Sequence, residues 1–466
     1  MKFTLSWLKD HLETDATVDQ VAEQLTMLGL EVEEIVDRAA ALQGFTIAYV
    51  REARQHPNAD RLRVCDVETA DGMVQVVCGA PNARTGMKGV FAASGMEIPG
   101  TGITLKPSKI RDVDSNGMLC SERELMISDE HDGIIDLPED APVGMSAVEY
   151  MGLDDPMIEI AITPDRGDCL GVRGIARDLA AAGLGTLKPL DTSAVKGSYV
   201  SPVGLSLDKL AATPDACPMF VGRHFTGVKN GPSPDWLQRR LTAIGLRPIS
   251  ALVDITNYVS YDLGRPLHVF DADTLSVRIA PRLAKEGETF VALDDKEYVL
   301  NDEVCVIADD AKAHAIGGVM GGAESGCTDE TVNVFLEVAL FDPTRIAEAG
   351  RKLGIVSDAR YRFERGIDPT SAEWGAEIAT RMILDLCGGE ASEPVSAGEM
   401  PDWRKSVSLR LSRTFSLGGV NVPPDAQEAI LGRLGFETRR DGEAIQARAR
   451  ETQMPRRRTG AEVQDR

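Results

Sequence analysis

The spacing of apolar residues predicts a helix close to the start of the chain. Thr17, with Gln20 three positions later, forms the capping-box pattern that begins helices, and Gly29 is placed to end one. Between them runs an apolar stripe at helical spacing, formed by Val18, Val21, Leu25 and Leu28. The stripe predicts an amphipathic helix that ends at Gly29.

Residues 44–137 follow a different pattern, because short β-rich runs alternate there with turn signals. The runs are FTIAYV, RLRVCDVET, MVQVVCGA, KGVFAAS and GITLKPSKI, and the turns between them include HPNAD, ADG and IPGTG. About five short strands in a segment of about 90 residues predict a small closed barrel, of which the oligonucleotide-binding (OB) type is the commonest.

The patterns after the barrel predict further domains. An alternating strand at 158–163 precedes a helical stretch at 168–182, so two pieces of a small α/β domain flank the barrel. Stretches rich in small and polar residues at 192–202 and 390–402 predict linkers, and residues 423–434 predict an amphipathic helix. We therefore predict an α+β multidomain protein with four parts: a small α/β domain (1–40 plus 148–195), an inserted OB-type β-barrel domain (41–147), a mixed α/β module (203–390) and the start of a further domain (401–466).

Composition places the chain among globular proteins. Of its 466 residues 43% are hydrophobic and 26% charged, which excludes extensive disorder. No apolar run approaches the ~20 residues that a membrane helix requires, and the first residues lack a secretory signal pattern, so we expect a cytoplasmic protein with no membrane partner. The eight cysteines are scattered without CxxC spacing, which indicates reduced and mostly buried thiols.

The net charge of −23 is distributed unevenly along the chain. Strong acidity disfavours nucleic acid as a partner, whereas residues 51–123 carry ten Lys or Arg against nine Asp or Glu. Candidate phosphate contacts in that segment are Arg51, Arg54, His56, Arg61, Arg63, Lys106, Lys109 and Arg111. Phe91 is its only aromatic residue, which favours contact with the backbone of a structured RNA over stacking on single strands. A solvated charged surface explains the same composition equally well.

A second group of residues able to do chemistry lies between 246 and 369. It includes Arg247, Thr256, His268, Glu337 and Ser357, together with the glycines of GGVMGG. The glycine spacing indicates tight turns or close approach of the backbone to another group, but it lacks the GxGxxG pattern and the following helix of a dinucleotide loop. No GxSxG elbow, HExxH or Walker loop is present, so the conventional hydrolase, zincin and NTPase classes are excluded. A lone histidine beside Pro and Phe is more often structural than catalytic.

Six groups of motifs, in order, resemble the bacterial phenylalanyl-tRNA synthetase beta subunit. They are FTLSWLKDHL with VAEQLTMLGLEVE; HPNADRLRVC with VVCGAPN and GMLCSERELM; ITPDRGDCLGVRGIARDLA; VDITNYV with GRPLHVFDAD; GGVMGG; and RFERGIDP, and the match runs from Met1 to about Phe436. The resemblance implies a tRNA-binding module in the barrel and an editing module over 205–390. It also implies an α2β2 heterotetramer in which the alpha subunit uses ATP to join phenylalanine to tRNA. The beta subunit would position tRNA(Phe) and hydrolyse tyrosine wrongly attached to it, and DNA is not an expected partner.

The resemblance also assigns roles to residues of the second group. Editing is needed because tyrosine differs from phenylalanine by one hydroxyl, which a hydrophobic pocket rejects by only about 10²-fold. Glu337 matches the glutamate that accepts a hydrogen bond from the phenol, a bond worth about 1.5–3 kcal/mol when charge-assisted. His268 and Thr256 match positions near the scissile ester and the terminal adenosine, and His268 would orient the attacking water or the ester. The other matches are Arg247, at the tRNA end, and Gly318, Ser357 and Ala359, in the pocket walls.

The end of the chain departs from the family pattern. Past Ile445 the sequence is cationic and nearly free of apolar residues, which indicates a basic RNA-binding tail or, the interpretation we favour, an interrupted domain. Mg²⁺ is expected for the family, but the acidic helix that binds it has no match and Asp465 alone cannot form the site, so we assign no metal ligands. Two hypotheses remain: the N-terminal portion of a beta subunit that binds tRNA and edits it, or a truncated, non-catalytic tRNA-binding fragment that cannot assemble with an alpha subunit. A third, an unrelated metabolic enzyme with an OB insertion, leaves the ordered motifs unexplained.

Overall fold

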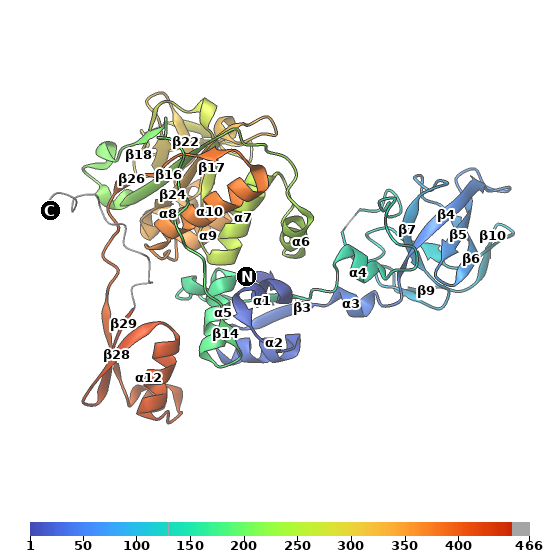
Figure 1. Cartoon of the computed structure of the whole chain (residues 1–466), viewed down its shortest axis with the longest axis horizontal. Coiled ribbons are helices and arrows are strands. Elements are labelled where there is room, and N and C mark those ends of the chain that lie inside the picture. The colour runs from blue at the N-terminus through green and yellow to red at the C-terminus, as the bar shows by residue number, and fades with distance from the viewer. Residues whose placement is uncertain (129, 450–466) are drawn as a thin grey trace. The chain divides into compact units, whose positions relative to one another are not determined.

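The computed structural model describes residues 1–128 and 130–449 of the chain (Figure 1). The chain forms two compact units, one comprising Met1–Glu33 with Glu159–Arg466 and the other comprising Glu34–Ile158. The second unit is therefore inserted into the first along the sequence. The cationic stretch 450–466 and Asp465 lie outside the described residues. Within the described ranges, no helix combines the length and the apolar character needed to cross a membrane.

The inserted unit is built on an antiparallel five-stranded sheet in the order β12-β7-β4-β5-β6. Its strands are β4 (Thr46–Gln55), β5 (Arg63–Thr69), β6 (Gly72–Cys78), β7 (Lys88–Ala92) and β12 (Met118–Leu119). The smaller elements are β8 (Glu97–Ile98), β9 (Ile103–Thr104), β10 (Ser108–Ile110), β11 (Val113–Ser115), α3 (Arg38–Ala41) and α4 (Ala147–Met151). A bulge between Val50 and Glu52 bends β4, which lets one long strand pair with β7 at one end and with β5 along most of its length. Val50, Cys65 and Val67 point inward and have no exposed surface.

The N-terminal part of the first unit confirms the predicted first helix. Its elements are β1 (Lys2–Thr4), α1 (Leu5–His11), β2 (Leu12–Glu13), α2 (Val18–Met27), α5 (Val172–Ala181) and β14 (Thr186–Leu187). The strands β3 (Val32–Val36) and β13 (Met157–Ile160) each span a boundary between the two units. Thr17 and Gln20 make both hydrogen bonds of the capping box, and Gly29 has the positive φ of +81° that ends the helix.

The helix predicted over 168–182 begins later than the sequence indicated. Residues Gly167–Cys169 form a short 3₁₀ turn, Gly171 is extended, and α5 starts at Val172. The turn folds back on the helix, because a Cβ at Gly174 would meet the carbonyl oxygen of Asp168 at 1.7 Å. Gly171 and Gly174 therefore allow a loop at residues that the apolar periodicity had predicted as the start of the helix.

The mixed α/β module that follows contains two five-stranded sheets and a two-stranded sheet. Its strands are β15 (Gly204–Leu205), β16 (Met219–Thr226), β17 (His268–Asp271), β18 (Arg278–Leu283), β19 (Thr289–Val291), β20 (Glu297–Val299), β21 (Cys305–Ala308), β22 (Ala313–Ile316), β23 (Met320–Gly321), β24 (Asn333–Leu340), β25 (Glu390–Ala391) and β26 (Val395–Gly398). Its helices are α6 (Asp235–Ala243), α7 (Ala251–Leu263), α8 (Pro343–Leu353), α9 (Asp358–Phe363) and α10 (Ser371–Cys387). One five-stranded sheet runs β17-β24-β16-β25, with β26 also paired to β16, and the other runs β15-β18-β21-β22-β23, whereas β19 and β20 form the two-stranded sheet.

The central strand β24 is buried on both faces. Phe335 and Ala339 belong to the apolar core that the two five-stranded sheets share, whereas α10 packs against β16 and β24. Successive side chains of a strand point to opposite faces, so residues 335, 337 and 339 face the second sheet and 334, 336 and 338 face the other way. Seven consecutive residues from Val334 to Leu340 are buried for this reason, as expected for a strand covered on both sides.

The last described part of the chain confirms the helix predicted over 423–434. Its elements are β27 (Ser406–Arg410), α11 (Arg413–Gly418), α12 (Pro424–Arg433), β28 (Phe436–Asp441) and β29 (Ala444–Ala449), with the strands in the order β27-β29-β28. Ile445, on the middle strand, has no exposed surface. These residues form a small α/β element at the end of the described chain.

Candidate functional site

A small pocket lies between the two five-stranded sheets of the mixed α/β module. Its volume is about 70 Å³. The residues that line it are Pro266, Leu267, His268, Ala315, Ile316, Gly318, Val319, Met320, Gly321, Glu337, Ala339, Ala359 and Phe363. The pocket therefore brings together four of the predicted site residues, His268, Glu337, Gly318 and Ala359.

His268 and Glu337 lie on neighbouring strands at the same level. β17 and β24 are antiparallel, and His268 is the direct partner of Glu337 in their register. Glu337 points toward the second sheet, like Phe335 and Ala339. The sequence places these two residues 69 positions apart, and the pairing of the strands makes them neighbours.

The glycines of GGVMGG shape the pocket and leave room for the histidine. A Cβ at Gly321 would meet Cε1 of His268 at 2.5 Å, so only glycine lets the imidazole lie there. Gly318 has a positive φ of +68°, and a Cβ on it would meet Ile346 and Phe341 at 2.8 Å. The motif is thus a close-packed turn that admits the imidazole, in agreement with the close approach that the spacing indicated.

Both polar groups of the pocket have atoms that no described residue satisfies. His268 Nε2 and Glu337 Oε2 are buried and have no hydrogen-bond partner in the described part of the chain. Burial lowers the pKa of His268 to about 4, so its imidazole is neutral at neutral pH. Burial raises the pKa of Glu337 to about 8, an effect that the charge of Arg265 opposes. Unsatisfied buried polar atoms that converge on a cavity are typical of a ligand-binding site.

We expect Glu337→Gln to stabilise the folded protein at alkaline pH. Between the ordinary pKa of 4.5 and the raised value of about 8, the folded state keeps a proton that the unfolded state has lost. The contribution of Glu337 to the free energy of unfolding therefore falls as the pH rises through this window. Glutamine does not titrate, so the variant does not lose this stability. The melting temperature of the variant should exceed that of the wild type at pH 8.5, and the gap should narrow toward pH 5.

The control for this measurement is Glu297→Gln, which changes an exposed glutamate of β20 in the same module. It should leave the pH dependence of the melting temperature unchanged. A difference in melting temperature between Glu337→Gln and the wild type that stays constant from pH 5 to pH 8.5 would contradict the raised pKa.

Three other predicted residues of this site lie outside the pocket lining. Thr256, on α7, donates its hydroxyl to the carbonyl of Val253 at 2.7 Å, and Arg247 is exposed in the loop between α6 and α7. Ser357 caps α9, and its hydroxyl donates to the carbonyl of Val319 at 2.6 Å. Ser357 thus ties the start of α9 to the glycine turn, which places Ala359 and Phe363 in the pocket wall.

Arg265 is a residue of this region that the sequence analysis did not identify. It is fully buried, and its Nη2 donates to the carbonyl of Ala339 in the pocket wall. Arginine is almost never fully buried, so nothing in GRPLHVFD predicts the burial of this side chain.

The candidate phosphate contacts of the inserted unit differ in their surroundings. Arg51 pairs with Glu68 and Arg54 with Asp66, so part of their charge is already neutralised. Lys109 lies 3.8 Å from Asp114. The exposed members of this candidate set for which no ion pair occurs within the described residues are Arg61, Arg63, Lys106 and Arg111.

His56 joins two loops of this unit. It is buried, and its Nε2 lies 3.0 Å from the carbonyl oxygen of Ile110 while its Nδ1 accepts from the backbone N–H of Asn58. Asn58 in turn donates to the carbonyl of Arg111, at 3.0 Å. Arg111 and Asp112 have positive φ values of 45° and 70°, which makes the tight turn between β10 and β11. The histidine therefore holds the loop after β4 against the β10–β11 hairpin.

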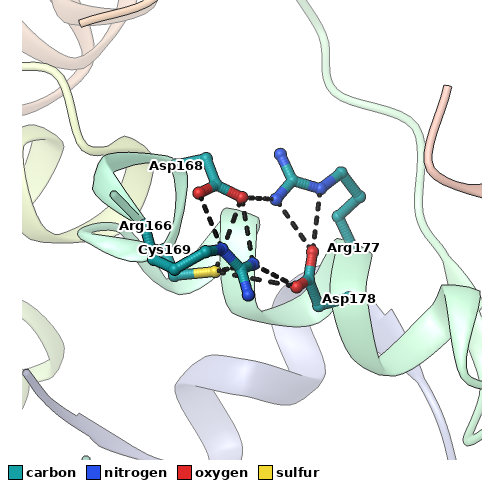
Figure 2. A network of polar contacts seen from close by, with 5 residues as sticks. All are labelled: Arg166, Asp168, Cys169, Arg177 and Asp178. Atoms are coloured by element: carbon teal, nitrogen blue, oxygen red, sulfur yellow. Dashed lines mark hydrogen bonds and ion pairs between the residues drawn. The ribbon is translucent and has the colours of Figure 1, made fainter. Parts of the chain in front are cut away.

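A third cluster of charged groups lies at the loop before α5 (Figure 2). Asp168, Cys169 and Asp178 form the one group of three possible metal ligands within 1–128 and 130–449. Figure 2 shows Arg166 and Arg177 directed at the two carboxylates, and each arginine forms ion pairs with both of them. Mg²⁺ takes oxygen ligands, and here the carboxylate oxygens are already bound by two guanidinium groups and the third ligand is a thiol. The cluster therefore does not fit Mg²⁺.

Comparison with known proteins matches two parts of the chain to family models. Residues 45–146 match a family described as "Putative tRNA binding domain", and residues 216–388 match the "B3/4 domain" family. The first match covers most of the inserted unit, and the second contains the pocket, including His268 and Glu337.

Two curated relatives that match nearly the whole of this chain carry the same name. The chain is 57% identical over 443 residues to the phenylalanine–tRNA ligase beta subunit of Cereibacter sphaeroides, covering 94% of this chain and 55% of that protein. It is 56% identical over 448 residues to the protein of the same name from Brucella abortus, covering 96% of this chain and 56% of the relative. The solved N-terminal fragment of the phenylalanyl-tRNA synthetase beta subunit from Pyrococcus horikoshii aligns with 67% of this chain and 91% of that one, at 14% identity and a TM-score of 0.30.

The chain spans about half the length of the curated relatives that it matches. Identity at this level extends over nearly the whole of the chain and includes both matched domains. Over the part of those proteins that it spans, the chain is similar to phenylalanine–tRNA ligase beta subunits at 56–57% identity.

Proposed function

We propose that the chain acts as the tRNA-binding and editing part of a phenylalanine–tRNA ligase, hydrolysing tyrosine that has been attached to tRNA(Phe). The observation that carries this proposal is the pocket in the B3/4 region, where a neutral imidazole and a buried carboxyl group lie side by side with unsatisfied atoms. A phenol hydroxyl is the group that such a carboxyl would bind, and a phenylalanine would leave it unpaired.

The proposed hydrolysis requires the protein to bind the aminoacyl group and to orient one water molecule. Glu337 accepts a hydrogen bond from the tyrosine hydroxyl and so fixes the aminoacyl group in the pocket. His268, neutral because burial lowers its pKa, has a free ring nitrogen that can accept a proton or a hydrogen bond from the attacking water. Water attack on the ester carbonyl releases tyrosine and leaves the tRNA with a free terminal hydroxyl. Thr256 and Arg247, near α7, are proposed to hold the terminal adenosine.

The inserted unit is proposed to be an OB-type barrel that binds tRNA. Its antiparallel five-stranded order and the match to a tRNA-binding family support this assignment. Arg61, Arg63, Lys106 and Arg111 carry exposed charge for phosphate groups, whereas Arg51, Arg54 and Lys109 would exchange an internal partner for phosphate. His56, which joins the two loops, would position them.

Attachment of phenylalanine itself is proposed to take place in an alpha subunit that binds ATP, with this chain as its partner in an α2β2 assembly. Mg²⁺ is expected of the family, and the group of three possible ligands in the described residues, Asp168, Cys169 and Asp178, does not fit it. The binding and hydrolytic roles proposed here rest on side chains of this chain alone.

The deciding experiment times ester loss from tyrosyl-tRNA and phenylalanyl-tRNA, both carried on tRNA(Phe), in the presence of the purified chain. We expect the tyrosyl ester to be lost at least about tenfold faster, because phenylalanine leaves the buried carboxyl group unpaired, at a cost of about 1–3 kcal/mol. Equal, uncatalysed decay of the two esters would refute editing and leave a tRNA-binding fragment. Measured as a function of tRNA concentration, the same assay gives KM for the tRNA.

A second arm of the experiment tests the tRNA-binding surface. Arg63→Gln with Arg111→Gln should raise KM, leave kcat unchanged and reduce the slope of log KM against log salt by about 1.5, as expected for two lost phosphate contacts. Arg84→Gln, which removes an arginine already paired with Asp136 in the same unit, is the matched control and should change the slope little.

A further inference from the structure

Arg265 is a buried arginine to which the proposed chemistry assigns no part. It lies in the turn between α7 and β17, three residues before His268, and has no exposed surface. Its Nη2 donates to the carbonyl of Ala339, whereas its Nε and Nη1 are buried without a hydrogen-bond partner in the described residues. A buried guanidinium with two unpaired donor nitrogens lowers the stability of the folded state, so its presence needs an explanation.

Three elements of the module enclose this side chain. β24 supplies the carbonyl of Ala339, and α9 supplies Phe363, whose ring centroid lies 5.8 Å from Arg265 Cζ. α10 supplies Gly375, where a Cβ would come 3.0 Å from Arg265 Cγ. The arginine therefore occupies a space that the glycine keeps open, and its guanidinium is held against the strand that carries Glu337.

The hydrogen bond to Ala339 and the contact with Phe363 place the guanidinium against two residues that line the pocket together with Glu337. Residues 337 and 339 are two positions apart, so both point to the same face, and both line the pocket. The positive charge of Arg265 lowers the pKa of Glu337, against the larger effect of burial. The guanidinium itself remains charged at neutral pH.

The other titratable groups around Glu337 carry no charge at neutral pH. His268, on β17, is neutral because burial lowers its pKa to about 4. Cys305, on β21, is protonated because burial raises its pKa to about 12, and Cys217, before β16, is protonated for the same reason. Asp368, which follows α9, acts on Arg265 rather than on Glu337. Arg265 is therefore the cation to which Glu337 responds among the described residues.

We propose that Arg265 is a positioning residue for specificity, supplying the buried positive charge that favours the ionised form of Glu337 as acceptor for a hydroxylated aromatic side chain. The inference rests on the proposed editing function and names what sets its selectivity. An ionised carboxylate makes a hydrogen bond about twice as strong as a neutral acceptor does. Selectivity for tyrosine over phenylalanine should therefore follow the ionisation of Glu337 and, through it, the charge at position 265.

The test measures binding of tyrosinamide and phenylalaninamide by calorimetry between pH 6 and 9, beside the ester-loss assay. In the wild type the ratio of the two affinities should rise about tenfold, with a midpoint near pH 8. Arg265→Gln keeps a donor for the Ala339 carbonyl but removes the charge, and it should move the midpoint upward by about one pH unit or more. Arg265→Lys restores a charge and should return the midpoint toward the wild-type value.

A double variant separates this role from a structural one. If Arg265 acts through Glu337, then Arg265→Gln made in a Glu337→Gln protein should leave the ratio of affinities unchanged. A midpoint that stays near pH 8 in Arg265→Gln, in a wild-type background that hydrolyses the tyrosyl ester, would overturn the inference and leave the editing function standing. Loss of selectivity in Arg265→Gln without a shift of the midpoint, and equally in Arg265→Lys, would also overturn it. A wild type that hydrolyses neither ester refutes the editing function itself, while the amide titrations still decide the role of Arg265.

Discussion

Replacing His268 by alanine is expected to slow the loss of tyrosine from tyrosyl-tRNA by about 10²- to 10⁴-fold. The imidazole is the group in the pocket with a free nitrogen, and it lies beside Glu337, the proposed site of the substrate hydroxyl. Because burial lowers its pKa to about 4, the imidazole stays neutral down to mildly acidic pH. The rate in the wild type should therefore hold from pH 7 to about pH 5, whereas an ordinary histidine would lose activity below its usual pKa of about 6.5.

The matched control for this variant is His224→Gln, which changes a histidine of β16 in the same module. His224 is outside the pocket lining, and its Nδ1 lies 2.9 Å from the hydroxyl of Tyr199. This change should alter the rate of tyrosyl ester loss less than threefold, by roughly the amount expected for a group remote from the reacting atoms. Full activity in His268→Ala would remove the histidine from the proposed mechanism.

The second large effect is expected on stability, from Arg223→Met. Arg223, on β16, has no exposed surface and donates to Glu377 on α10, to the carbonyl of Ser392 and to the carbonyl of Val195. Its loss leaves a buried carboxylate and two carbonyls without that partner. Breaking a buried ion pair from one side costs about 3–5 kcal/mol, so the melting transition of the module should fall by many degrees.

Arg351→Met serves as the control, because it makes the same chemical change at an exposed arginine of α8 that hydrogen-bonds to its own helix. It should shift the melting temperature by an amount corresponding to less than about 1 kcal/mol. Equal effects of the two variants would show that the Arg223–Glu377 pair contributes nothing beyond an ordinary surface charge.

Elements with strong local signals were predicted well. The helix at Thr17–Gly29 and the helix at 423–434 follow from capping residues and apolar spacing, which act between neighbours in the sequence. The start of α5 was misplaced because apolar spacing continues through Gly167–Cys169, whereas the chain there turns tightly against Gly174. The segment 192–202 was predicted as a linker from its composition. It has almost no regular structure, yet Val195 is held by Arg223 and Glu377.

The candidate site also combines residues that the sequence predicted with properties that it did not. Motif resemblance selected His268, Glu337, Gly318 and Ala359, and all four line one pocket. The ionisation of these groups could not be predicted, because the pKa of a histidine or a glutamate depends on how completely the surrounding residues exclude water. Arg265 was missed because its importance comes from the side chains around it and not from its position in a motif.

The sequence by itself determined the resemblance to phenylalanine–tRNA ligase beta subunits, the division into an inserted β-rich unit and a mixed α/β module, and the residue types that meet in the pocket. It could do so because apolar spacing, capping and ordered motifs depend on residues that are close together in the sequence. Only the tertiary structure decided that His268 pairs with Glu337, that Gly321 makes room for the imidazole, and that Arg265 is buried against β24. Strand register and burial arise from contacts between segments tens of residues apart, and those contacts set the charge of the groups in the site.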